Sequence, residues 1–304
     1  MDNATETTGV ECGNKTIYDP SKPWQFKDST GAVKASYFPQ ITVGGNINWD
    51  KEAWEELSHI AFTRVYYISR FNKPNRTPRL TWAYGQINSN IPVTELSQSQ
   101  INYVYEKCGL YPTIKLESLP RSIVFPDQKH PCDIVDYRGL TFESELMPFW
   151  LEKLALHCRQ LAVLNWGFET QYNSCILGKY EDTDDSINFH TDDEVFLAHH
   201  FCANVTLGYA RDFQFKDETK AVHEIKLGHK SVFFFLALEH ALPKRAAVRS
   251  GEIRYSISFR NMQSNVGIGN SFYYCRGVDG AINNERKLEY QQTLAQLQNE
   301  KQNQ

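Results

Sequence analysis

A histidine and a carboxylate stand two residues apart near the middle of the chain, in the segment His190-Thr191-Asp192. Side chains alternate between faces along an extended strand, so His190 and Asp192 would point the same way. Two histidines and one carboxylate on one face of a metal, with other positions open, are the ligands of non-heme Fe(II) oxygenases. The pair alone is a weak signal, because His-x-Asp recurs by chance, and a second histidine must come from elsewhere.

His240 is the best candidate for that second histidine. It follows residues 232–238, the longest apolar run of the chain, which is typical of a buried strand that ends at the mouth of a barrel. His199 and His200 compete with it, but they follow His190 so closely that only a tight loop would return them to the same ion. Ordinary core or surface positions are their commoner explanation.

A second polar pattern lies between Arg254 and Arg260. On a regular strand these two arginines share one face with Ser256 and Ser258, while apolar residues occupy the other face. A buried row of this kind is costly unless an anion meets it. A dicarboxylate cosubstrate would satisfy it, with Arg254 binding one carboxylate through two parallel hydrogen bonds. A solvated edge strand is the alternative, and alternation does not exclude it.

The surrounding sequence predicts the elements that position these residues. Apolar residues at helical spacing predict helices over residues 96–108 and 147–164. Several short strand-like runs, separated by glycine, predict an all-β barrel or sandwich in the second half of the chain. These runs are residues 201–207, 211–215, 222–227, 230–238 and 253–259.

Residues 61–79 combine basic and aromatic side chains without any acidic residue. Residues 72–78 predict a turn between two extended arms. Basic side chains can neutralise phosphates and aromatic faces can stack on bases, and Phe71 could insert into a base stack. The alternative is a solvated hairpin whose aromatic residues belong to the core, and both interpretations stay open. The basic residues are Arg64, Arg70, Lys73, Arg76 and Arg79.

Composition limits the class of protein. The chain has 304 residues, of which 41% are apolar, so it can bury a sizeable core. A net charge of −4 argues against a surface that binds polyanions everywhere, and any nucleic-acid contact must be local. Seven cysteines without a Cys-x-x-Cys pair predict reduced thiols. Without a signal peptide or an apolar run of about 20 residues, we expect the nucleus or cytoplasm.

Four segments together resemble the AlkB-like 2-oxoglutarate- and Fe(II)-dependent dioxygenases, especially the nucleic-acid dealkylases. The segments are PRLTWAYG at 78–85, YNSCILGKYEDTDDSINFHTDDE at 172–194, HALPK at 240–244 and RYSISFR at 254–260. The resemblance implies a mainly β protein with flanking helices, built on a double-stranded β-helix (jelly-roll) core.

The resemblance also divides the chain. It implies a dioxygenase domain over residues 61–280, with a nucleotide-recognition lid at about 61–90. Residues 1–60 would form an N-terminal extension, and residues 281–304 would form a polar tail.

The same resemblance implies roles for individual residues. Fe(II) would be bound by His190, Asp192 and His240. The cosubstrate 2-oxoglutarate would be held by Arg254 and Tyr180, with Arg260 at its keto-acid end and Ser256 among the residues that bind it. The substrate base would be contacted by Arg79, Tyr84, Phe71, Asp193 and Glu194.

Three positions depart from the family pattern. Gly178 stands where the family has asparagine two residues before the tyrosine, and Ser256 and Ser258 replace asparagine and threonine. These changes remove or shorten hydrogen-bonding groups near the cosubstrate, without touching the metal ligands.

The activity that the resemblance implies is oxidative N-dealkylation of alkylated DNA or RNA, a base-repair reaction that releases formaldehyde, succinate and CO2. A base inside a duplex must be flipped out, or be single-stranded already, to reach such a pocket. Two alternatives stay open. The same metal site could act on a protein or a small molecule, or the chain could be a catalytically inactive module that binds modified nucleic acid.

Overall fold

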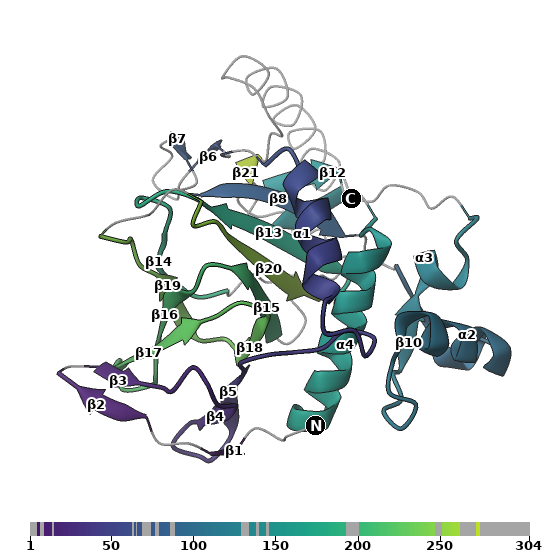
Figure 1. Cartoon of the computed structure of the whole chain (residues 1–304), viewed down its shortest axis with the longest axis horizontal. Coiled ribbons are helices and arrows are strands. Elements are labelled where there is room, and N and C mark those ends of the chain that lie inside the picture. The colour runs from purple at the N-terminus through teal and green to yellow at the C-terminus, as the bar shows by residue number, and fades with distance from the viewer. Residues whose placement is uncertain are drawn as a thin grey trace, which may run out of the picture.

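Two β-sheets face each other at the centre of the computed structural model (Figure 1). The structure describes residues 5–6, 9–13, 15–62, 64, 66–68, 74–76, 79–85, 89–128, 134–137, 140–143, 146–192, 201–246, 251–261 and 272–273. The larger sheet has the order β1-β4-β5-β18-β15-β20-β13-β8. The smaller of the two facing sheets has the order β14-β19-β16-β17-β3-β2.

Eight consecutive strands, β13 to β20, make the centre of both sheets. Along the chain they pass back and forth between the sheets, and every pairing among them is antiparallel. This is the double-stranded β-helix, so the predicted jelly-roll fold is confirmed. Their bounds are β13 Ser174–Tyr180, β14 Ile187–His190, β15 Phe201–Gly208, β16 Arg211–Lys216, β17 Val222–Leu227, β18 Ser231–Leu236, β19 Glu239–Leu242 and β20 Arg254–Arg260.

Strands from the first 85 residues extend both sheets at their edges. In the larger sheet β5 pairs with β18 and β8 pairs with β13, and in the smaller sheet β3 pairs with β17. The proposed division of the chain at residue 60 stays a prediction, but strands on its N-terminal side belong to the same two sheets. The strands of the first 85 residues that extend the two sheets are β1 Thr5–Glu6, β2 Val10–Cys12, β3 Lys15–Ile17, β4 Trp24–Lys27, β5 Val33–Phe38 and β8 Leu80–Gly85.

Helices cover the outer face of the larger sheet. Residues of α1 (Trp49–His59) and α4 (Phe149–Trp166) share one apolar cluster with the odd-numbered residues of β13, β15 and β20 (Figure 1). A second cluster fills the space between the two sheets. The even-numbered residues of β20 therefore face the interior of the jelly roll, where the site described below lies.

The remaining helices form a third cluster beside α4. Ser97 and Gln100 make a capping box at the start of α2 (Gln98–Cys108), which ends at Gly109 in the left-handed conformation. The helices predicted over 96–108 and 147–164 are confirmed within two residues at each end. No described helix is long and apolar enough to cross a bilayer. The smaller elements are η1 Val93–Glu95, α3 Arg121–Val124, β9 Asn90–Pro92, β10 Ser118–Pro120, β11 Ile134–Tyr137, β12 Leu140–Glu143 and β21 Phe272–Tyr273.

The basic and aromatic stretch forms a hairpin, as the sequence predicts. Its arms are β6 (Tyr66–Ile68) and β7 (Pro74–Arg76), which pair antiparallel. The predicted turn at 72–78 is wrong in position, because residues 74–76 pair as the second arm. Pro74 and Asn75 suggest a turn from the local sequence alone. In the structure both residues pair with the first arm of the hairpin.

Candidate metal and anion site

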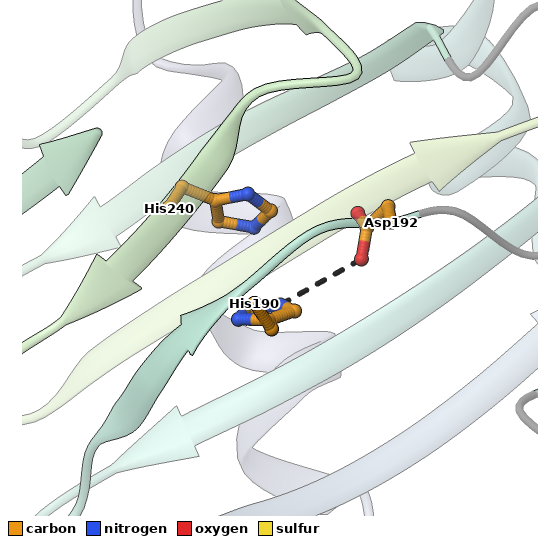
Figure 2. A group of neighbouring side chains, drawn as sticks. All are labelled: His190, Asp192 and His240. Atoms are coloured by element: carbon orange, nitrogen blue, oxygen red, sulfur yellow. Dashed lines mark ion pairs between the residues drawn. The ribbon is translucent and has the colours of Figure 1, made fainter. Parts of the chain in front are cut away.

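Neighbouring strands of the smaller sheet bring two histidines together. His190 ends β14 and lies opposite His240 of β19 in the strand register, with ring centroids 4.2 Å apart. Asp192 follows two residues later, and its Oδ1 lies 3.6 Å from Nε2 of His190 (Figure 2). Each of the three residues offers one ligand atom, and these atoms lie within 4.8 Å of one another. The structure thus brings together the three residues that the sequence proposes as metal ligands.

Backbone carbonyls orient both imidazole rings. Nδ1 of His190 lies 2.8 Å from the carbonyl oxygen of Asn188, and Nδ1 of His240 lies 2.8 Å from that of Leu238. A carbonyl oxygen only accepts, so Nδ1 is the protonated nitrogen in each ring and Nε2 keeps its lone pair. Metal-binding histidines are held in this way in known sites. The donor set, two imidazoles and a carboxylate, suits a divalent transition metal.

Arg260, the last residue of β20, binds the carboxylate of Asp192, the acidic member of the proposed metal site. Nη2 of Arg260 donates to Oδ2 of Asp192 at 2.6 Å, and both side chains are buried. The sequence places Arg260 near the keto-acid end of a cosubstrate, and the structure adds an ion pair with the carboxylate of the proposed ligand set. A charge-assisted hydrogen bond of this kind fixes the orientation of a buried carboxylate.

Arg254, at the start of β20, is a buried cation, and among the residues that the structure describes no carboxylate lies at hydrogen-bond distance from it. Nη2 of Arg254 donates to Oγ1 of Thr206 at 3.0 Å, whereas Nε and Nη1 have no hydrogen-bond partner among the residues that the structure describes. Burial lowers the pKa of Arg254 to about 10, and Tyr180 opposes this shift. Burying two N–H donors of a charged group without hydrogen-bond partners costs free energy. A bound carboxylate would accept hydrogen bonds from both donors.

Tyr180 lies close to two arginines. It is opposite Arg254 in the register of β13 and β20, and the guanidinium carbon of Arg254 is 5.1 Å from its ring centroid. The guanidinium of Arg211 lies 5.6 Å from the same ring. Sequence reasoning did not single out Arg211, because it begins a predicted strand and no motif marks it. The electrostatic field at Tyr180 is therefore more positive than Arg254 alone would make it.

Arg79 lies against Gly178. A Cβ built on Gly178 would lie 3.4 Å from Nε of Arg79 and 3.2 Å from Cε2 of Tyr180. Arg79 also contributes to the electrostatic lowering of the pKa of Arg254. Its side chain therefore lies at the proposed anion site, so the assignment of Arg79 to substrate binding has a competing explanation.

Ser256 and Ser258 are tied to the neighbouring strand. Nδ2 of Asn204 donates to Oγ of Ser256 at 2.7 Å and to Oγ of Ser258 at 2.8 Å. Oδ1 of Asn204 lies 3.5 Å from Nη2 of Arg254. The polar face of β20 is thus an interior face organised by hydrogen bonds, and the alternative of a solvated edge strand is wrong because β13 and β15 flank β20.

Other proposed substrate contacts gain no support from the structure. Tyr84 pairs with Cys175 in the register and packs against the helix-covered cluster, on the face of the sheet opposite Gly178. Arg64 donates to the buried carboxylate of Asp185 at 2.6 Å, so this basic residue anchors the segment that leads into the hairpin. Phe71, Asp193, Glu194, His199 and His200 lie outside the described residues.

No protein-family model and no curated protein sequence matches the chain. Among solved structures, OsALKBH1 aligns with a TM-score of 0.33 and 14% identity, over 39% of this chain and 66% of that chain, just under two thirds. A 2OG-Fe(II) oxygenase family oxidoreductase from Burkholderia pseudomallei aligns with a TM-score of 0.34 and 17% identity, over 43% of this chain and 68% of that chain. Likeness at this level leaves the function to be inferred from the residues of the chain.

Proposed function

We propose that the protein is an Fe(II)- and 2-oxoglutarate-dependent dioxygenase. The observation that supports this proposal is the convergence of His190, Asp192 and His240 inside a jelly roll. One strand, β20, carries both Arg260, which pairs with Asp192, and the buried Arg254. Three protein ligands leave positions open on the metal for a cosubstrate and O2. Bound iron with 2-oxoglutarate supplies the oxidising chemistry, and the protein supplies binding and orientation.

The residues divide the work of binding the cosubstrate. Nε and Nη1 of Arg254, which have no hydrogen-bond partner among the described residues, would bind the distal carboxylate of 2-oxoglutarate, and Tyr180 lies against the guanidinium. Thr206 and Asn204 both lie at Nη2 of the same guanidinium and would hold it with Nε and Nη1 left for the ligand. At the other end of β20, Arg260 orients Asp192, one of the three proposed metal ligands. A dianion spanning the two ends would neutralise the positive charge of the pocket.

The substrate that we propose is an alkylated base in DNA or RNA, from which oxidation of the alkyl carbon releases an aldehyde. The four sequence segments that resemble nucleic-acid dealkylases support this choice, as does the hairpin of β6 and β7 in the basic stretch. Hairpins that carry basic and aromatic residues can hold a strand by its phosphates and bases. The acidic residues Asp193 and Glu194 would face a methylated, positively charged base.

The metal assignment is tested by anaerobic titration with Fe(II) and 2-oxoglutarate, read as a metal-to-ligand charge-transfer band. His190→Ala and His240→Ala should lose the band, because each removes one of three ligands. His229→Ala is the matched control, since His229 lies in a surface turn and pairs with Asp50. A band of unchanged intensity in either ligand variant would overturn the site.

The substrate assignment is tested with a panel of methylated DNA and RNA oligonucleotides, where mass spectrometry detects loss of the methyl group. Arg70→Glu combined with Lys73→Glu should abolish this loss while 2-oxoglutarate decarboxylation without substrate continues. Arg79 is left unchanged because it lies beside the cosubstrate pocket. Turnover of cosubstrate with no demethylation of any oligonucleotide would contradict the nucleic-acid proposal and keep the oxygenase.

A further inference from the structure

The two carboxylate oxygens of Asp192 have different surroundings. Oδ1 faces the histidines, 3.6 Å from Nε2 of His190. Oδ2 accepts a hydrogen bond from Nη2 of Arg260 at 2.6 Å and a second from Sγ of Cys202 at 3.4 Å. A carboxylate only accepts, so the thiol is the donor in the second contact. One oxygen is thus occupied by protein donors, and the other is directed at the metal group.

The two donors come from adjacent strands of the larger sheet. Ala203 of β15 pairs with Phe259 of β20, so the next residues, Cys202 and Arg260, share the interior face. Cys202 is a free thiol with 1% of its surface exposed, and it belongs to the apolar cluster between the sheets. In such surroundings water does not replace a lost donor, and a hydrogen bond to an ionised carboxylate gains strength.

We propose that Cys202 is a positioning residue for the metal ligand Asp192. Together with Arg260 it holds Oδ2, so that Oδ1 is the oxygen that Asp192 would offer to a metal. The inference rests on the proposed metal site. Arg260 makes the shorter and charge-assisted contact, whereas the thiol prevents the carboxylate from rotating about that single hydrogen bond.

The thiol contact has a measurable consequence for metal binding. Losing a hydrogen-bond partner of a metal ligand typically weakens metal affinity by about 10- to 100-fold. A thiol is a weak donor, so we expect the lower end of that range for its removal, about 10-fold. The Asp192 carboxylate would then also be able to bind through both oxygens, which changes the electronic spectrum of the bound ion.

The test measures anaerobic affinity for Fe(II) and Mn(II) by competition with a chelator in the full chain. Cys202→Ala should bind both ions about 10-fold more weakly, and Cys202→Ser should recover most of the affinity because its hydroxyl still donates. Cys175→Ala is the matched control: Cys175 is equally buried but lies on β13 in the helix-covered cluster. This variant should bind the metals like the wild type.

The outcomes separate the two proposals. If the wild type binds neither ion, the proposed metal site fails before the role of Cys202 is reached. If the wild type binds and Cys202→Ala retains affinity within about twofold of it, Cys202 does not position Asp192. If the serine variant folds and is as weak as the alanine variant, the thiol acts by packing, and the proposed role of Cys202 is equally refuted. Circular dichroism checks that each variant is folded. If Cys202→Ala does not fold, the metal affinity of Cys202→Ser alone decides whether Cys202 positions Asp192.

Discussion

At the scale of single residues, neutral Asn204 keeps the charge of Arg254 available. Its amide approaches Nη2 of Arg254 at 3.5 Å through Oδ1, while Nδ2 is used by Ser256 and Ser258. An amide orients the guanidinium without neutralising it, whereas a carboxylate at the same place would form an internal ion pair. The choice of asparagine therefore favours an external anion at this site.

Asn204→Asp tests this argument. The new carboxylate should pair with Arg254 and repel the distal carboxylate of 2-oxoglutarate, which should weaken cosubstrate binding by at least about 10-fold, a free-energy change of about 1.4 kcal/mol. Anaerobic titration of the Fe(II)-loaded protein measures the affinity. Asn102→Asp, on the exposed face of α2, is the control for an added charge. Unchanged affinity in the Asn204 variant would show that Arg254 does not hold the cosubstrate.

At the scale of elements, α4 carries two buried titratable groups with opposite pKa shifts. Burial raises the pKa of Glu152 to about 7, and Oε1 of Glu152 accepts a hydrogen bond of 3.3 Å from Ser122 of α3. Burial lowers the pKa of His157 to about 4, and its Nε2 accepts from the backbone N–H of Gly44. Each shift favours the neutral form in the folded state.

The two shifts affect stability in opposite directions. Between about pH 4.5 and 7 the folded protein holds a proton on Glu152 that the unfolded chain loses, so this contribution to stability falls as the pH rises. Between about pH 6.5 and 4 the unfolded chain protonates the histidine and the folded protein does not, so this contribution falls as the pH drops. The two effects oppose each other where their ranges overlap.

Glu152→Gln should isolate the carboxyl effect. The glutamine has nothing to ionise, so the stability of the variant relative to the wild type should rise between pH 5 and pH 8, by up to about 3 kcal/mol. Urea unfolding at several pH values gives the difference, and the contribution of His157 cancels in the subtraction. A difference that does not change with pH would mean that Glu152 is ionised inside the folded protein.

The elements also show how far sequence reasoning reaches. The spacing of apolar residues predicted α4, and the two-residue spacing of His190 and Asp192 placed both on one side of the chain. The register that sets His240 opposite His190 depends on the path of the chain between them, so local spacing could suggest this pairing but could not determine it. The contact of Cys202 with Asp192 arises from pairing between β15 and β20, and no local pattern announces it.

At the scale of the whole molecule, the N-terminal segment closes the interior between the two sheets. Tyr18, Trp24 and Tyr37 belong to the same apolar cluster as Phe215 and Phe233 of the jelly roll. The ring centroids of Trp24 and Tyr18 are 4.3 Å apart. Isolated aromatic residues among polar ones give no periodic signal, so the sequence predicts only an N-terminal extension. Long-range pairing to strands about 200 positions away supplies the missing information.

If the N-terminal segment is part of the core, Trp24→Ala should cost about 3–5 kcal/mol of unfolding free energy, because it leaves a large cavity between the sheets. Ile47→Ala, at an exposed position of the same segment, should stay within about 0.5 kcal/mol of the wild type. Denaturant unfolding measures both. The affinity of folded Trp24→Ala for Fe(II) should match the wild type, since none of the three proposed metal ligands comes from this segment.

By the same reasoning, a fragment that begins at residue 61 should not fold, because it exposes the edges of β17 and β18 and opens the interior to water. A stable, metal-binding fragment of that length would show instead that the jelly roll is complete without its N-terminal strands.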